Sequence, residues 1–479
     1  MENIALATLL LPFLGALLIA FSPRRFAKGL CVFFSLIATL GMGALAYVYY
    51  CHGKTDVTIV LYHYGPVELF GFIMDRVSLL IGFAVVSLGL LVSLYSCGYM
   101  SKGNREHPQE GDNRYFAFLL IFIGAMAGLT LSSTILGQLL FFEITGACSW
   151  ALIGYYQKAK SLRSALKALL VTHIASIGLY LAAAWLFACT GTFALSAMSQ
   201  LTMTSKLVVF GGILFAAWGK SAQLPLHVWL PDAMEAPTPV SAYLHAASMV
   251  KVGVYIFARA ILSAGEVPHV IGVVGVIMAM ITLIYGFMMY LPQKDMKRLL
   301  AYSTITQLSY IFLALSLSIF GSHMAFDAGV AYIFNHAYAK SLFFLVAGAL
   351  SFSCGTRMLP KLRGMLKRLP LLGIGFCVAA LAIAGVPPFN GFFSKFPLFA
   401  AGFALSREYS WMTPLLVIAL IESVATFAWF LWWFGRTVPG EPSDEVASAS
   451  AVPVSMKVVV VVLIIMSLCS SVIASYWLK

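Results

Sequence analysis

The chain has 479 residues, of which 61% are hydrophobic and only 10% are charged. Soluble domains usually carry about 25% charged residues, and the mean hydropathy of +0.93 places most of this chain inside a lipid bilayer. This composition excludes a soluble enzyme, a disordered scaffold and a nucleic-acid binder. The net charge of +12 comes from basic residues in short loops, where such residues orient helices.

The sequence contains no pattern typical of a cofactor or metal site. Eight cysteines are scattered without a C-x-x-C motif or a His/Cys cluster, so we expect no disulfide framework and no iron–sulfur or zinc site. Glycine motifs for nucleotides and the serine nucleophile motif are also missing. We therefore expect no cofactor, and no catalytic or redox centre in the chain itself.

Hydropathy predicts an all-α polytopic membrane protein. A spanning helix needs about 20 mostly apolar residues. In chain order, the rule predicts about fourteen spans at 3–21, 29–50, 72–97, 115–131, 134–156, 165–189, 206–223, 240–263, 269–291, 299–320, 326–353, 370–404, 411–434 and 457–477. We group them into an N-terminal three-helix segment (1–114), a first five-helix repeat (115–263), an inverted second repeat (269–434), and a loop with the C-terminal helix (435–479).

Loop charges predict the orientation in the membrane. The loops after spans 1, 3, 5, 9 and 11 are rich in lysine and arginine, as at Lys158, Lys160 and Arg163, whereas the loops after even-numbered spans carry about one basic residue each or none. The positive-inside rule then places the odd-numbered loops in the cytoplasm. We therefore expect a multi-pass protein of the bacterial inner membrane with both termini periplasmic and an uncleaved first helix.

Proline interrupts two spans at comparable places in the two halves. The segment 224–231 (LPLHVWLP) interrupts span 7, and the segment 385–391 (GVPPFNG) interrupts span 12. Proline removes a helix hydrogen bond, and paired broken helices in the two halves of a membrane protein point to a transport site. Two ordinary proline kinks are the alternative interpretation.

We single out nine ionisable residues of the predicted spans that cannot be assigned to loops. They are Glu143, His173, Lys220, His245, Lys251, His336, Lys340, Lys395 and Glu422. A charged side chain at a helix centre costs about 2.5–3.5 kcal/mol, and such residues usually face the bundle interior and mark ion or proton paths. Lysines in a low dielectric and histidines exchange protons near neutral pH, whereas a sodium or calcium site needs clustered oxygen ligands. The residue types therefore predict a proton path.

Individual positions differ in what their spacing indicates. His336 and Lys340 are four residues apart and share one helix face, whereas His245 and Lys251 are six apart and share a face less well. His173 suits a hydrogen-bonded core histidine as well as a functional role, and Glu422 is left open. Lys167 lies near a span end, where we expect its long side chain to reach the interface.

The segment 220–239 (KSAQLPLHVWLPDAMEAPTP) resembles the signature of the antiporter-like subunits of respiratory complex I, Mrp-type cation/proton antiporters and membrane-bound [NiFe] hydrogenases. The similarity continues at 240–251 (VSAYLHAASMVK), 293–303 and 334–337, and covers about 115–434. Within this family the chain most resembles subunits of the hydrogenase 4 or formate hydrogenlyase type. The largest members carry a long lateral helix after the fourteenth span, which we expect this chain to lack.

The resemblance implies a role for each residue of the path. Glu143 matches the glutamate of span 5, with Lys220 as its lysine partner on broken span 7. The remaining positions are relay residues His245 and Lys251 on span 8, His336 and Lys340 on a broken span 11, and Lys395 at the terminal position of span 12.

The expected function is proton translocation by a membrane subunit of a multisubunit oxidoreductase, through this Lys/His/Glu relay. The expected partners are other membrane subunits, including antiporter-like paralogues, peripheral hydrogenase and iron–sulfur subunits, and the lipid bilayer, with no nucleic acid. A component of an Mrp-type Na⁺/H⁺ antiporter is the alternative, and a non-pumping structural subunit is the second alternative.

Overall fold

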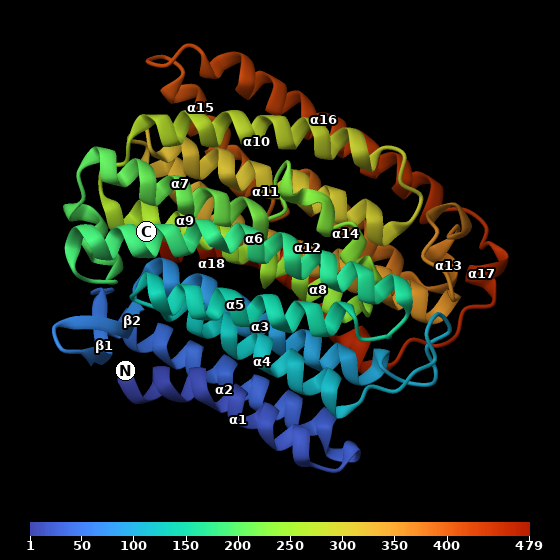
Figure 1. The fold of residues 1–479 in the computed structure, drawn as a ribbon. Coiled ribbons are helices and arrows are strands. Elements are labelled where there is room, and N and C mark those ends of the chain that lie inside the picture. The colour runs from blue at the N-terminus through green and yellow to red at the C-terminus, as the bar shows by residue number, and fades with distance from the viewer.

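A computed structural model describes all 479 residues. The chain forms a bundle of helices that lie roughly alongside one another, with one small hairpin at an end (Figure 1). The first part comprises α1 (Glu2–Phe21), α2 (Arg24–Cys51), β1 (Val57–Tyr64), β2 (Val67–Met74), α3 (Arg76–Tyr99), α4 (Asn113–Leu131), α5 (Ile135–Ile153), α6 (Ala159–Thr190), α7 (Met203–Lys220), α8 (Thr238–Ala246) and α9 (Met249–Ala264). The second part comprises α10 (His269–Tyr290), α11 (Met296–Ser318), α12 (His323–Cys354), α13 (Met365–Arg368), α14 (Pro370–Ala384), α15 (Phe392–Leu405), α16 (Met412–Thr437), α17 (Asp444–Ala447) and α18 (Val454–Leu478).

The predicted class, a polytopic all-α membrane protein, is confirmed. Twelve helical segments are long and apolar enough to cross a membrane, with α8 and α9 counted as one, and α14 and α15 are shorter apolar helices. Each of the fourteen predicted spans has a helical counterpart, the seventh being α7 and the twelfth the pair α14 and α15. The most apolar stretches of α11 and α12 are entirely buried, whereas α1, α2, α16 and α18 present most of theirs outward. The two inverted repeats stay a prediction.

The predicted break of span 12 is confirmed. Helix α14 ends at Ala384, and α15 begins at Phe392. Buried asparagines hold the connecting segment against α12 and α18. The Asn390 side chain donates to the Asn335 carbonyl at 2.9 Å and to the Ser470 hydroxyl at 2.9 Å, and Ser470 donates to the Asn335 side chain at 2.9 Å.

Other breaks differ from the prediction. Pro225 does not lie inside a helix, because α7 already ends at Lys220 and the next segment forms two short 3₁₀ turns, Leu226–Trp229 and Asp232–Glu235. Span 8 is broken between α8 and α9, where the amides of Ala247 and Ser248 both donate to the Tyr243 carbonyl. The expectation of a broken span 11 was wrong, since α12 is one continuous helix of 32 residues without proline.

An antiparallel hairpin of β1 and β2 precedes α3 and was not predicted. It pairs Val57 with Met74 and Tyr64 with Val67. Hydropathy alone extended the third span back to residue 72, because the second strand is as apolar as the helix that follows it. The side chain of Asp75 separates the two elements, since it accepts hydrogen bonds from the amides of Val77 and Ser78 and so caps α3.

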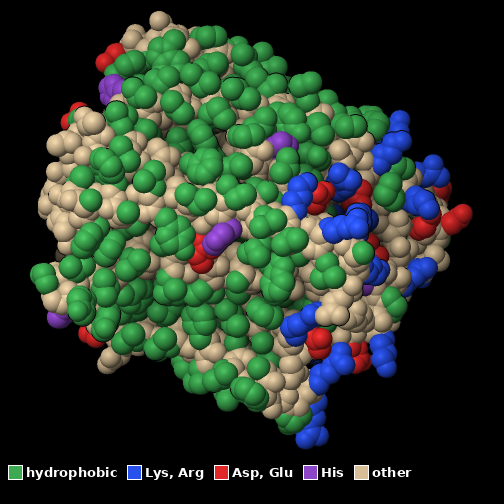
Figure 2. Space-filling view, in the orientation of Figure 1, with side chains coloured by type: hydrophobic (Ala, Val, Ile, Leu, Met, Phe, Trp, Pro, Cys, Tyr) green, Lys and Arg blue, Asp and Glu red, His purple; other side chains and the backbone are tan.

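Both ends of the chain lie at the same end of the bundle (Figure 1). In the same orientation, lysine and arginine side chains gather at the opposite end, and the surface between is largely hydrophobic (Figure 2). Basic residues of the hairpin end bind the last carbonyls of α18: Lys54 donates to Trp477 at 3.2 Å, and Arg76 donates to Leu478 at 2.9 Å.

A buried ion pair joins α3 to α9 close to the hairpin. Arg259 is 1% exposed and Asp75 is 3% exposed. The Arg259 guanidinium donates from Nη2 to Asp75 Oδ1 at 2.9 Å and from Nη1 to Oδ2. Arg259 Nη2 also lies 3.4 Å from the hydroxyl of Tyr255, one turn earlier on α9. This bidentate pair connects two segments that are far apart in the sequence.

We expect Arg259→Met to destabilise the protein strongly, because the substitution leaves the Asp75 carboxylate buried without its cation. Loss of one partner from a buried pair costs about 3–5 kcal/mol. The double variant Asp75→Leu/Arg259→Met should recover part of this loss, since it buries no unpaired charge. Thermal unfolding of the purified protein in detergent measures the effect, and an Arg259→Met midpoint equal to wild type would contradict it.

Candidate functional site

Six of the seven predicted path residues are buried in the bundle. Lys220, His245, Lys251, His336, Lys340 and Lys395 are each at most 4% exposed. Glu143 is the exception, with 27% of its side chain exposed. Burial of so many titratable groups is costly unless each has a polar partner, and the partners lie on neighbouring helices.

The centre of the site is a contact between α9 and α12. Lys251 Nζ lies 2.8 Å from Nδ1 of His336. One turn further along α12, Lys340 donates to the Ser303 hydroxyl of α11 at 2.9 Å. His245 on α8 contacts the Thr304 hydroxyl at 3.2 Å. His245 and Lys251, which sequence spacing separated, therefore both contact α12 from the two sides of the break before α9, His245 through the Phe344 ring and Lys251 through His336.

His336 lies at the centre of this cluster, because it contacts Lys251 at 2.8 Å and Lys340 follows one turn later on the same helix. The Nε2 atoms of His245 and His336 are buried without a hydrogen-bond partner in the chain. Each imidazole thus has one nitrogen in contact with a neighbour and one free nitrogen that could accept or donate a proton.

Lys220 lies at the last residue of α7, where the proline-rich segment begins. Its ammonium group donates to the Phe142 carbonyl at 2.9 Å and to the Thr145 hydroxyl at 3.3 Å, and lies 4.3 Å from the centroid of the Phe142 ring. The hydroxyl of the adjacent Ser221 donates to the Val250 carbonyl at 2.7 Å, directly before Lys251. The end of α7 is therefore tied to the start of α9.

Glu143 pairs with His173 and not with Lys220. Oε2 of Glu143 lies 2.9 Å from Nδ1 of His173, whose side chain is 60% exposed. No ion pair within 4.0 Å joins Glu143 to Lys220, although Glu143 is the carboxylate that acts electrostatically on this lysine. The second carboxylate oxygen, Oε1, is buried without a partner. The structure thus places Glu143 between a surface histidine and a buried lysine.

The Glu143–His173 pair lies on an apolar outer face of the bundle. Leu170 and Ile177 flank His173 on α6 and are 52% and 61% exposed, and Leu140 on α5 is 55% exposed. A polar pair among lipid-facing leucines and isoleucines loses solvation unless another polar group covers it.

Lys395 lies four residues into α15, after the second break. It donates to the Ser423 hydroxyl of α16 at 3.0 Å and to the Ala384 carbonyl at 3.3 Å, and its Nζ lies 4.7 Å from the centroid of the Tyr310 ring. The freed carbonyl at the end of α14 thus becomes a ligand of the lysine.

Several buried ionisable residues were missed or left open by sequence reasoning. Arg259 and Asp75 form the ion pair described above, and Lys206 donates to the carbonyls of Ala264 and Glu266 at 2.9 and 2.7 Å. Glu422, left open, is 6% exposed. Arg259 could have been identified from the sequence, since it is a charged residue inside predicted span 8. Lys167 pairs with Asp232 at 2.8 Å, as its interfacial position suggests.

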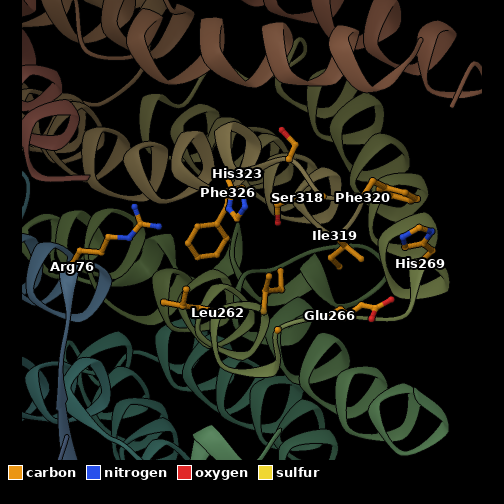
Figure 3. A pocket seen from close by; sticks show the side chains of 14 residues that line it. Arg76, Leu262, Glu266, His269, Ser318, Ile319, Phe320, His323 and Phe326 are labelled. Atoms are coloured by element: carbon orange, nitrogen blue, oxygen red, sulfur yellow. The ribbon is translucent and has the colours of Figure 1, made fainter. Parts of the chain in front are cut away.

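A groove near the chain termini is separate from this buried cluster. It is a half-open cavity of about 400 Å³ between the ends of α9 and α11 and the starts of α3, α10 and α12. Figure 3 shows Arg76 and His323 on one side of it and Glu266 and His269 on the other. These polar residues line the rim, and none belongs to the predicted path.

The fold and the buried lysines and histidines define a class: multi-pass membrane proteins with ionisable side chains buried inside the helix bundle. Residues 132–425, well over half of the chain, match the family described as "NADH:quinone oxidoreductase/Mrp antiporter, TM". Residues 69–116 match the family "NADH-Ubiquinone oxidoreductase (complex I), chain 5 N-terminus". The chain belongs to this NADH:quinone oxidoreductase/Mrp antiporter family.

Relatives of known name come from both branches of the family. The chain is 34% identical over 436 residues to NADH-quinone oxidoreductase subunit L of Campylobacter jejuni, with 89% of this chain and 70% of that protein covered. It is 35% identical over 415 residues to a Na⁺/H⁺ antiporter subunit of Alkalihalophilus pseudofirmus, covering 81% of this chain but only 51% of that protein. The fold also matches a chain of the archaeal membrane-bound sulfane sulfur reductase, with a TM-score of 0.86, 24% identity and coverage of 100% and 96%.

We expect the face around His173 to be covered by protein in an assembled complex, because an exposed histidine–glutamate pair is poorly solvated by lipid. A photo-crosslinking residue at Ile177 should then join a second membrane subunit. The same variant in the isolated protein is the control, where only lipid adducts should form. Lipid adducts alone from the intact complex would contradict the prediction.

Proposed function

We propose that the chain is a proton-translocating membrane subunit of a multisubunit oxidoreductase, of the formate hydrogenlyase type of [NiFe] hydrogenase. The path comprises Glu143, Lys220, His245, Lys251, His336, Lys340 and Lys395. The observation that carries the proposal is the 2.8 Å contact between Lys251 and His336 at the centre of a buried series of proton-exchanging side chains.

The central contact suits proton exchange. A lysine ammonium gives a proton to a neutral imidazole, which leaves a neutral amine and an imidazolium, and no other bond changes. The imidazolium then releases a proton from Nε2, the nitrogen without a partner in the chain. Histidine is suited to this step because its two nitrogens can receive and release protons on opposite sides of the ring.

Glu143 and Lys220 form the loading end of the path. When Glu143 turns from His173 towards Lys220, its carboxylate stabilises the lysine ammonium, because opposite charges attract strongly in a low dielectric. When Glu143 returns to His173, the ammonium loses this stabilisation and gives up its proton towards the centre. The end of α7 at Lys220 allows such movement, since the next segment is irregular and not helical.

The partners in this proposal are other membrane subunits, including an antiporter-like paralogue, and peripheral hydrogenase and iron–sulfur subunits that perform the redox chemistry. The Glu143–His173 face supports the membrane partner, because it is apolar around a half-exposed ionic pair. The position of the basic residues at one end supports a bacterial inner-membrane orientation with both termini periplasmic (Figures 1 and 2).

A component of an Mrp-type Na⁺/H⁺ antiporter is the second candidate, supported by the similarity to the Na⁺/H⁺ antiporter protein of Alkalihalophilus pseudofirmus. Reconstitution of the whole complex in proteoliposomes separates the two. Proton uptake that depends on hydrogenase turnover supports the first proposal, and proton movement driven by a sodium gradient without turnover supports the second. A complex that turns over without any cation movement would support a non-pumping structural subunit.

We expect Lys220→Arg to reduce proton uptake at least about tenfold in the assembled complex, because guanidinium stays protonated at physiological pH and cannot release the proton. Glu143→Gln should also reduce proton uptake, since it removes the charge that stabilises the protonated form of Lys220. A purely structural lysine would tolerate arginine, which keeps the positive charge. Near-wild-type uptake by Lys220→Arg would therefore contradict the mechanism.

We expect a reporter that is active only in the cytoplasm to be inactive when fused after Lys479. The last carbonyls of α18 are held at the hairpin end, opposite the basic end. The same reporter inserted in the 359–364 segment, beside Lys361 and Arg363, is the positive control. Strong activity after Lys479 would overturn the orientation.

A further inference from the structure

Glu422 is a buried carboxylate on a helix that otherwise faces outward. Its neighbours on α16, Ile421 and Val424, are 62% and 61% exposed, whereas Glu422 is 6% exposed. Its side chain contacts tyrosines of α10 and α11, and in Figure 1 α10 and α16 run beside each other. A carboxylate buried in this way is costly, and no residue of the proposed path accounts for it so far.

Three hydroxyl groups surround the Glu422 carboxylate. Tyr310 donates to Oε2 at 2.5 Å, Thr426 donates to Oε1 at 2.5 Å, and Tyr290 donates to Oε1 at 3.3 Å. Each carboxylate oxygen thus has a hydroxyl within hydrogen-bond distance that can stabilise the anionic form, although the Tyr310 hydroxyl also contacts the Ala419 carbonyl at 2.7 Å. The three hydroxyl groups therefore form a polar pocket that can accommodate a negative charge on Glu422.

Tyr310 lies between Glu422 and Lys395. Its hydroxyl contacts the carboxylate at 2.5 Å, while Lys395 Nζ lies 4.7 Å from the centroid of its ring. Lys395 also bonds Ser423, the residue next to Glu422, at 3.0 Å. No ion pair within 4.0 Å joins the two charges. One phenol thus connects a buried cation to a buried anion.

A second tyrosine continues this contact towards the centre of the site. The Tyr332 ring lies 6.3 Å from the Tyr310 ring and 6.4 Å from the His336 ring. The Tyr332 hydroxyl donates to Oε1 of Gln307, whose Nε2 is buried without a partner. Polar groups therefore extend from His336 through Tyr332 and Tyr310 to Lys395 and Glu422.

We propose that Glu422 is the counter-charge of Lys395, a positioning residue that acts across the ring of Tyr310 to hold the lysine ammonium at the end of the second half of the path. The inference rests on the proposed proton translocation. In a low dielectric, a carboxylate stabilises a nearby ammonium even without direct contact. Removal of the Glu422 charge leaves Lys395 with only neutral ligands, so the Lys395 amine no longer takes up a proton.

The test is proton uptake per turnover in proteoliposomes that contain the assembled complex. Glu422→Gln preserves the size of the side chain and removes its charge, and uptake should fall at least about tenfold while the complex still assembles. Glu422→Asp should restore part of the uptake, because it restores the charge. Glu408→Gln, in the exposed turn between α15 and α16, is the matched control and should behave as wild type.

A double variant shows whether Glu422 acts through Lys395. If it does, Lys395→Ala/Glu422→Gln should lose no more uptake than Lys395→Ala alone, since coupled residues are not additive. Additive losses, or equal loss in Glu422→Gln and Glu422→Asp, would mean a packing role and would overturn the inference.

Two further outcomes separate this inference from the proposed function. Normal uptake in Glu422→Gln together with lost uptake in Lys395→Ala overturns the inference and leaves the proposed function intact. Normal uptake in both Glu422→Gln and Lys395→Ala would show that protons do not pass through the second half of the path, which would overturn the proposed function. If Glu422→Gln fails to assemble, Tyr310→Phe removes the hydroxyl that contacts Glu422 while keeping the ring over Lys395. Uptake should then fall several-fold, and wild-type uptake in Tyr310→Phe would overturn the inference.

Discussion

Burial of lysine and histidine in the middle of an apolar bundle is the constraint on which the rest of this structure depends. Lipid offers no hydrogen bonds, so every such group needs a partner from the chain itself. Lys251 contacts His336, Lys340 donates to Ser303, Lys220 donates to the Phe142 carbonyl, and Lys395 donates to the Ala384 carbonyl. The most apolar stretches of the innermost helices α11 and α12 are entirely buried, and the outer helices shield them from lipid.

Helix ends near the buried lysines follow from the same constraint. A carbonyl inside a helix already accepts a hydrogen bond from its own helix, whereas the last carbonyls of a helix have no such donor. The end of α14 provides the Ala384 carbonyl to Lys395, whereas Lys220, the last residue of α7, contacts the Phe142 carbonyl inside α5. The broken segments therefore solve a solvation problem, and they also leave the backbone free to rearrange where protons are exchanged.

Hydropathy predicted the helices well, because a lipid-facing or buried helix must be apolar along its whole length. It could not separate β2 from α3, since both are apolar, and it could not foresee the break at Ala247 and Ser248, which contains no proline. The proline-rich segment after Lys220 was predicted correctly as irregular, but it follows α7 and does not divide it.

Residue types within spans predicted the buried cluster, but not its pairings. Contacts between separate helices have no sequence signal: Lys251 and His336 are 85 residues apart, and Asp75 and Arg259 are 184 apart. The pairing of Glu143 with His173 depends on how α5 and α6 are rotated, and spacing along one helix carries no information about this. Glu422 was visible as a charge in a span, yet its tyrosine partners on α10 and α11 appear only in three dimensions.

The asparagine contacts to α18 have a consequence for how the chain is made. The chain is synthesised from its N-terminus, so α12 and the segment around Asn390 enter the membrane before residues 467–470 leave the ribosome. Until then, Asn335 and Asn390 lack the Ser470 hydroxyl, and Asn390 lacks the Ser467 carbonyl. Closure of the second half is therefore a late step of biogenesis, and chains that stop before α18 expose polar groups that membrane quality control can recognise.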